Sequence, residues 1–263
     1  SSRPGVNGAG EYRSGAGGQL KLQPSGGGSL SGQMLGTREW MPLDGVAGGF
    51  PGSTTVYEIT RADGTVERVS TKAAGVVLEP GDTFEVRTGS SGGLGDPLDR
   101  DAAAVVRDIA VRRITADDAL AAYGVCLDVT GAVDQAATEA RRHELRADRL
   151  ARASAPVRAL DDDSVVGLPG GEEVPLYPGV VQVGVVARAV RSGAPLAIAP
   201  DHWTDGCPVL EEPVHEQGPG PQIVARSYLD PRTGRTLHVE SVPAGAPRAF
   251  SVLPKRWIEA RGS

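Results

Sequence analysis

Polar and apolar residues alternate along several short stretches of the first ninety residues. Gln19–Gln23 has the period of two that is typical of a strand. The stretch VYEITRADGTVERVS holds two alternating runs on either side of Asp63-Gly64, a dipeptide typical of hairpin turns because its glycine accepts a positive φ. The stretch GVVLEPGDTFEVRT predicts two more strands joined by a turn at Pro80-Gly81-Asp82. Together these runs predict a small antiparallel sheet.

The spacing of the apolar positions becomes helical after residue 99. Ala103, Val106 and Ile109 share one face of a helix predicted over 100–111. Two aspartates, Asp99 and Asp101, stand where a side chain can cap the first turn of that helix.

Two further helices are predicted downstream. Thr115 and Asp118 come close to a capping box, and Gly124 is typical of a helix C-terminus, so a short helix is expected between them. Asp134 is placed to cap a long helix with a narrow apolar stripe, which is typical of a helix on a surface. The arginines of this helix can be solvated or can bind an acidic partner surface, and the sequence does not distinguish these two interpretations. These arginines are Arg141, Arg142, Arg146, Arg149 and Arg152.

The last hundred residues have a different character. Proline, glycine and an acidic cluster break both periods over 155–175, which indicates a linker, and we place a domain boundary near Pro156. Strands are predicted within 179–190 and over 235–242. The predicted fold class is α+β: antiparallel sheets, a helical segment over about 100–153 and a small β-rich C-terminal module. The expected domains are 1–155 and 156–263.

Composition narrows the function classes. Of 263 residues, 36 are glycine and 20 proline, so many turns must join short strands. The net charge is −6 and no Lys/Arg run interrupts the sequence, so we expect no nucleic-acid partner. Two cysteines do not make a disulfide framework, and no apolar run is long enough to span a bilayer. We therefore expect a cytoplasmic protein with no membrane partner.

The stretch SSGGLGDPLDRD resembles a phosphate-binding loop that leads into a helix. A P-loop needs a lysine after its glycines, and no lysine follows Gly93 or Gly95. A dinucleotide-binding loop needs a third glycine, which is also missing. What remains is a turn that permits close backbone approach, followed by Asp96.

An ordered set of motifs around this loop resembles the C-terminal part of the hydantoinase B/oxoprolinase family. The resemblance covers roughly residues 5–152. Its motifs are GAGEYRSGAGG, REWMPLDGVAGGFPG, LEPGDTFEVRTGSSGGLGDPLDRDAAAVVRDI, ITADDALAAYGVCLD and GAVDQAATEARRHELRADR. Two loops depart from the family pattern, at Arg13-Ser14-Gly15 and at Ser91-Gly92-Gly93-Leu94-Gly95.

The resemblance implies a non-autonomous subunit of an ATP-dependent cyclic-amide hydrolase, or of a related ketone carboxylase. It implies a hetero-oligomer in which a nucleotide-binding A-type subunit holds ATP and Mg²⁺. The family's B-type subunit is longer, so we expect this chain to be half of a split B-type subunit whose N-terminal half is another polypeptide. Catalytic residues are not assigned. The expected substrate or interface loop residues are Arg13, Gly93, Gly95, Asp96 and Arg100.

The C-terminal module more faintly resembles the small subunit of the related carboxylases, for which a zinc-ribbon-like fold is expected. Tetrahedral Zn²⁺ takes four nitrogen or sulfur ligands, and cysteines are missing from half of the expected positions. The sequence leaves two interpretations, a zinc site or a Cys-Pro turn with exposed histidines. The candidate ligands are His202, Cys207, His215 and Asp230.

Other residues that can carry chemistry receive structural interpretations. Cys126 is expected to be a buried small apolar residue, His143 to be solvated and His238 to lie on a strand surface. Trp40 and Trp203 are expected to anchor loops against a core. The alternative to a subunit with catalytic duties is a purely structural assembly module, and a third interpretation is an independent ligand-binding module.

Overall fold

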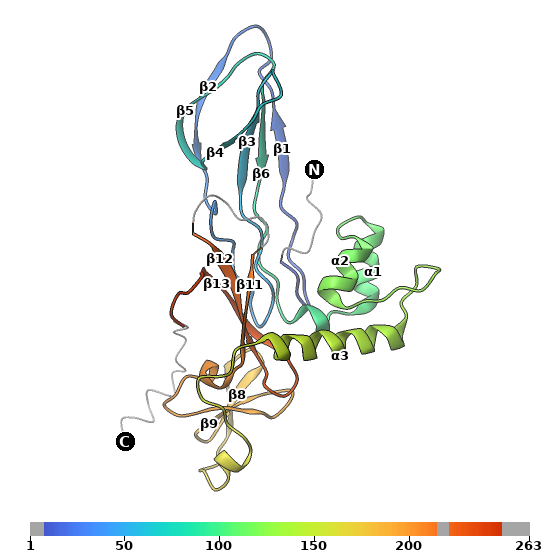
Figure 1. The fold of residues 1–263 in the computed structure, drawn as a ribbon, viewed down its shortest axis with the longest axis vertical. Coiled ribbons are helices and arrows are strands. Elements are labelled where there is room, and N and C mark those ends of the chain that lie inside the picture. Colours follow the sequence, from blue (N-terminus) through green and yellow to red (C-terminus); the bar gives the residue numbers. More distant parts are fainter. Residues whose placement is uncertain (1–7, 215–220, 249–263) are drawn as a thin grey trace.

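A computed structural model describes residues 8–214 and 221–248 of the chain. The described residues form an α+β fold of antiparallel sheets and three α-helices, as predicted (Figure 1). The helices are α1 (Ala102–Ala110), α2 (Ala116–Tyr123) and α3 (Gln135–Arg152). The strands are β1 (Gln19–Leu22), β2 (Leu30–Leu35), β3 (Val56–Thr60), β4 (Val66–Val69), β5 (Lys72–Leu78), β6 (Thr83–Arg87), β7 (Glu173–Tyr177), β8 (Val180–Val183), β9 (Val186–Ala189), β10 (Pro195–Ile198), β11 (Val209–Pro213), β12 (Ile223–Leu229) and β13 (Thr236–Pro243).

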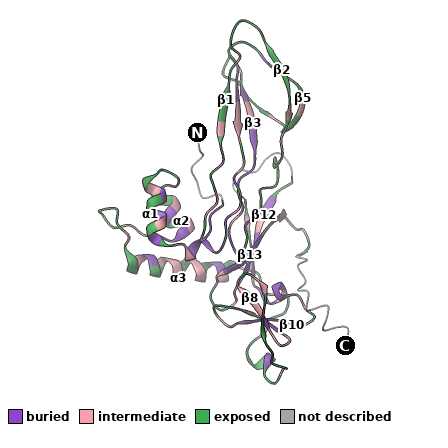
Figure 2. Ribbon diagram, turned by 180° about the vertical axis from the view of Figure 1, so that it is seen from behind, coloured by how far each residue is buried: buried purple, intermediate pink, exposed green. Residues whose placement is uncertain are grey.

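Strands β1–β6 build a long arm that projects from the rest of the molecule (Figure 1). One sheet has the order β1-β6-β3-β4 and a second sheet pairs β2 with β5. The β3–β4 hairpin is confirmed, with Gly64 at φ +86° in its turn. Ile59, Leu78 and Phe84 form the small core of the arm, whereas exposed residues cover most of its tip (Figure 2).

The pairing of β5 differs from the prediction. β5 and β6 follow each other across the turn at 80–82 but belong to different sheets, because β5 pairs with β2. No sequence pattern indicated β2, since LSGQML lacks alternation and is almost wholly exposed. Alternation of polar and apolar residues arises when one face of a strand is buried, so a pair of strands that are almost wholly exposed shows no such pattern in the sequence.

The helices begin and end largely where the caps predicted. Thr115 and Asp118 form the complete capping box of α2, and Asp134 caps α3. The buried face of α1 was predicted wrongly, because the structure buries Ala102, Val105 and Asp108. Asp108 is buried on that face because it forms ion pairs there. A pattern built from apolar residues alone cannot include a buried aspartate, so it placed the buried face one residue too late.

The C-terminal part holds two sheets, β10-β9-β8-β7 and β11-β12-β13. Their shared core includes Trp203, Cys207 and Tyr228, each at most 2% exposed, which confirms the expectation for Trp203. Trp40 was expected to anchor a loop but is 52% exposed. His238 was expected on a surface but is 7% exposed, because β13 lies between the core and the N-terminal part of the chain.

Loop 43–54 joins the two parts of the chain. The backbone N–H of Ala47 donates to Tyr177 Oη (3.1 Å), and that of Ser241 donates to Asp44 Oδ1 (2.6 Å). The division at Pro156 remains a prediction. No helix among the described residues has the length and apolar character needed to cross a membrane.

Candidate functional site

Three glycine-rich segments, 8–18, 43–54 and 88–95, lie side by side and form what we call the glycine layer. The N–H of Gly93 donates to Phe50 O (3.0 Å) and the N–H of Gly95 donates to Val46 O (2.9 Å). A Cβ atom added to Gly93 would lie only 2.2 Å from Ala9 O. Neighbouring backbone therefore fills the space in which a phosphate-binding loop would hold its ligand.

The buried carboxylate of Asp108 brings two of the predicted loop residues together. Arg13 Nε lies 3.3 Å and Arg100 Nη2 2.9 Å from Asp108 Oδ2. Arg100 also donates to Glu11 O, and Arg113 lies 3.6 Å from the other oxygen of Asp108. These contacts fix the glycine layer against α1. Sequence reasoning missed Asp108, although its position three residues after Val105 was a usable signal.

Asp96 is a buried junction between three elements. Its side chain is fully buried and accepts hydrogen bonds from Arg149 Nη1 (2.8 Å), Thr236 N (2.8 Å) and Leu98 N (2.9 Å). Burial by itself would raise the pKa of this carboxyl, but the Arg149 charge and the three hydrogen bonds outweigh burial and lower the pKa. An ionised Asp96 therefore ties the glycine layer to α3 and β13.

Asp99 is shared by three guanidinium groups from different parts of the chain. Arg146 lies 2.7 Å and Arg191 3.2 Å from Oδ1, and Arg235 pairs with Oδ2. Asp99 thus does not cap α1, a role that Asp101 fills alone. It joins α3 to the C-terminal sheets.

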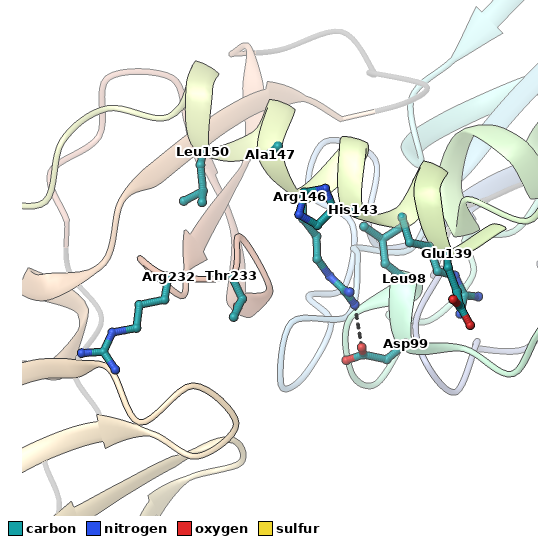
Figure 3. A pocket seen from close by; sticks show the side chains of 10 residues that line it. Leu98, Asp99, Glu139, His143, Arg146, Ala147, Leu150, Arg232 and Thr233 are labelled. Atoms are coloured by element: carbon teal, nitrogen blue, oxygen red, sulfur yellow. Dashed lines mark hydrogen bonds and ion pairs between the residues drawn. The ribbon is translucent and has the colours of Figure 1, made fainter. Parts of the chain in front are cut away.

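A groove of about 640 Å³ opens between α3 and the turn that carries Arg232 and Thr233 (Figure 3). Arg146 reaches across its wall to Asp99, while Ala147 and Leu150 give the helix side an apolar surface (Figure 3). The remaining lining residues are Leu98, Glu139, Arg142 and His143.

The sequence left open whether the arginines of α3 are solvated or bind a partner, and the structure shows that most of them contact other parts of this chain. Arg142 donates to the carbonyl oxygens of Tyr123 (3.0 Å) and Arg100 (2.6 Å), and Arg146 and Arg149 bind the buried aspartates. Arg141 and Arg152 pair with acids on their own helix, and Arg152 also pairs with Glu212. Four of the five, all but Arg141, therefore contact other elements of the protein.

The predicted zinc ligands do not assemble into a metal site in the described part of the chain. Cys207 is fully buried, its Sγ–H points to Trp203 O, and burial raises the pKa of the thiol well above its ordinary value. Asp230 accepts hydrogen bonds from the backbone N–H groups of Arg232 and Thr233. No described group of three His, Cys, Asp or Glu side chains is arranged to hold a metal, and His215 lies outside the described residues. Among the described residues, the candidate ligands therefore form no zinc site.

Three of the other candidate residues have clear environments. His143 is exposed, as predicted, whereas Cys126 was expected to be buried and is only half-buried. His238 Nδ1 lies 2.9 Å from Tyr177 Oη, and its ring stacks on Tyr228. Burial, and secondarily the nearby His202, lower the pKa of His238 to about 4. This histidine is therefore neutral at physiological pH.

Comparison with known proteins finds a family to which part of the sequence is similar. Residues 1–97 match the sequence model described as Hydantoinase B/oxoprolinase. The N-terminal part of the chain is therefore similar to this family. A curated relative, caprolactamase subunit beta of Pseudomonas jessenii, is 32% identical over 146 residues, which are 51% of this chain and 24% of the relative. The chain thus spans about a quarter of that relative's length.

Two solved structures of ATP-dependent enzymes resemble part of this hydantoinase B-like chain. The structure of ATP-dependent caprolactamase from Pseudomonas jessenii has 30% identity and a TM-score of 0.44, covering 54% of this chain and 25% of that chain. The nucleotide-free structure of acetone carboxylase has 23% identity and a TM-score of 0.49, covering 60% and 25% of the two chains. The similarity to the family rests on the sequence match over residues 1–97.

Proposed function

We propose that this chain is part of a B-type subunit in an ATP-dependent enzyme that opens a cyclic amide such as a lactam. The observation that carries the proposal is the sequence match of residues 1–97 to the hydantoinase B/oxoprolinase family, supported by the 32% identity to caprolactamase subunit beta. ATP and Mg²⁺ are bound by a nucleotide-binding A-type partner subunit. This is consistent with the absence of nucleotide-binding motifs from the sequence.

Within that assembly the chain acts as a scaffold. The polar residues expected at a substrate loop are already engaged inside the protein: Arg13 and Arg100 with Asp108, and Asp96 with Arg149. The backbone N–H groups of Gly93 and Gly95 donate to protein carbonyls. An arrangement with so few available donors supports positioning of neighbouring segments over direct substrate chemistry, so the catalytic groups are expected elsewhere in the assembly.

A ketone carboxylase is the second candidate. The motifs HWTDGCPVLEEP and RSYLDPRTGRTLHVE, which resemble the small subunit of such enzymes, favour it. The two reactions separate in one assay on the complex purified with this chain, in which ATP hydrolysis is followed with ε-caprolactam or 5-oxoproline and with acetone or acetophenone. Stimulation by lactams supports the hydrolase. Stimulation by ketones in the presence of bicarbonate supports the carboxylase.

Native mass spectrometry of the chain from its own cell tests the assembly. Recovery with a larger nucleotide-binding polypeptide supports the proposal, and a second partner of B-type sequence supports the expectation that another polypeptide supplies the remainder. Recovery as a 27.2 kDa monomer contradicts membership of a complex.

A further inference from the structure

The groove beside α3 has a charge opposite to that of the protein as a whole. Although the chain carries a net charge of −6, three arginines line the described groove: Arg142, Arg146 and Arg232. Two carboxylates also line the groove: Asp99, which is shared by Arg146 and by two arginines of the C-terminal part, and the exposed Glu139. Asp162, outside the lining, pairs with Arg232. Around the groove, five arginines outnumber these three carboxylates, and this local excess of guanidinium groups attracts a further anion. The five are Arg142, Arg146, Arg191, Arg232 and Arg235.

The arrangement of these arginines runs against helix stability. Arg142 and Arg146 stand one turn apart on α3, and like charges at this spacing are unfavourable. Burial and the charge of Arg146 lower the pKa of Arg142, and the nearby aspartates, Asp99 first among them, offset this lowering only in part. Hydrogen bonds to Tyr123 O and Arg100 O nevertheless fix its guanidinium in place.

The groove is also shaped to receive side chains. Ala147 and Leu150 provide apolar surface next to the arginines, and Thr233 faces them from the opposite wall (Figure 3). His143 projects beside them from α3, is exposed, and makes no hydrogen bond or ion pair with any described residue. Arginine with adjacent apolar surface is the composition enriched at the centres of protein interfaces.

We propose that this groove docks an acidic segment of a partner polypeptide, whose carboxylates meet Arg142, Arg146 and Arg232 and whose apolar side chains pack on Ala147 and Leu150. The inference rests on the proposed function, because it requires that the chain works in an assembly. It assigns to the groove an assembly role that is separate from the loops expected near substrate.

Zero-length cross-linking tests the contact directly. His143→Lys places an amine in the groove without removing any contact of the protein, and a carbodiimide joins that amine only to a carboxylate in direct contact. In the complex purified from its cell, the expected product links residue 143 to an Asp or Glu of a partner. Ala140→Lys, an exposed position on the same helix outside the groove, is the matched control and is expected to give no such product.

An added negative charge supplies the second measurement. His143→Glu is expected to weaken association with the partner at least about tenfold at low salt, with the difference shrinking as ionic strength rises, whereas Ala140→Glu leaves it unchanged. Thermal melts of both variants verify that the fold is intact.

The outcomes separate the two proposals. An intact complex without the residue-143 product, and with unchanged affinity for His143→Glu, overturns the docking role alone. Binding of pyrophosphate in the groove without any cross-link also overturns it, in favour of a small-anion site. A chain that is monomeric in its cell contradicts both the docking role and the proposed function.

Discussion

Replacing Asp96 by asparagine removes one negative charge from the most buried ion pair among the described residues. The asparagine side chain would keep the size of the original and one oxygen for the N–H of Thr236, but its NH2 group cannot accept the hydrogen bond that Leu98 N donates to the other oxygen. The substitution therefore removes the charge together with one backbone hydrogen bond. Arg149, only 10% exposed at its side chain, would then be a buried cation without its carboxylate. Breaking a buried pair in this way destabilises by about 3–5 kcal/mol. We expect Asp96→Asn to lower the free energy of unfolding by that amount.

Urea unfolding followed by circular dichroism at about pH 7.5, where Asp96 is ionised, measures the change. The double variant Asp96→Asn/Arg149→Met removes the orphaned cation, so it is expected to recover at least about 2 kcal/mol of the loss. Recovery stays incomplete because Arg149 also stacks over the ring of Phe50, 5.8 Å from its centroid. Arg152→Met, at a half-exposed position on the same helix, serves as the control and changes stability by less than about 0.5 kcal/mol.

The pH dependence adds an independent check. Because the pKa of Asp96 is lowered on folding, its contribution is fully present above the ordinary value of 3.8 and is lost as pH falls through the folded pKa. Asp96→Asn lacks this loss, so the two unfolding curves converge in acid. A loss below about 1 kcal/mol for Asp96→Asn at neutral pH, or a double variant no more stable than the single one, would refute the buried-pair reasoning.

Three other predictions follow from the packing. His238 stays neutral in the folded protein but gains a proton on unfolding in mild acid. The free energy of unfolding should therefore fall by about 1.4 kcal/mol per pH unit between about pH 6.5 and about pH 5, before carboxylates titrate. In urea titrations, His238→Gln should flatten that slope. Gly93→Ala should destabilise by at least about 2 kcal/mol while Gly28→Ala, with no atom within 4 Å of the added Cβ, leaves the urea midpoint unchanged; equal midpoints would contradict the glycine layer. Cys207 should react with a thiol reagent only on unfolding, and a fast reaction that disappears in Cys207→Ala would show that the burial is wrong.

Local signals in the sequence determined the ends of the helices and the first hairpin. Caps at Thr115 and Asp134 and the turn at Asp63-Gly64 depend on neighbours only a few residues away, so the sequence alone specifies them. The resemblance to the family was likewise readable from the motifs, and the match to residues 1–97 confirmed it. The missing lysine after Gly93 argued against a P-loop from the sequence alone, because that loop needs the lysine charge to hold phosphates.

Only the tertiary structure decided what the polar residues do. Asp96 and Arg149 are 53 positions apart, and Asp99 and Arg235 are 136 apart, so no local pattern pairs them. The same holds for Gly93: position 93 must be glycine because the backbone of Ala9 leaves no room for a Cβ atom there. Charge and small size are visible in a sequence, but the partner that gives them a role is chosen by the folding of distant segments onto one another.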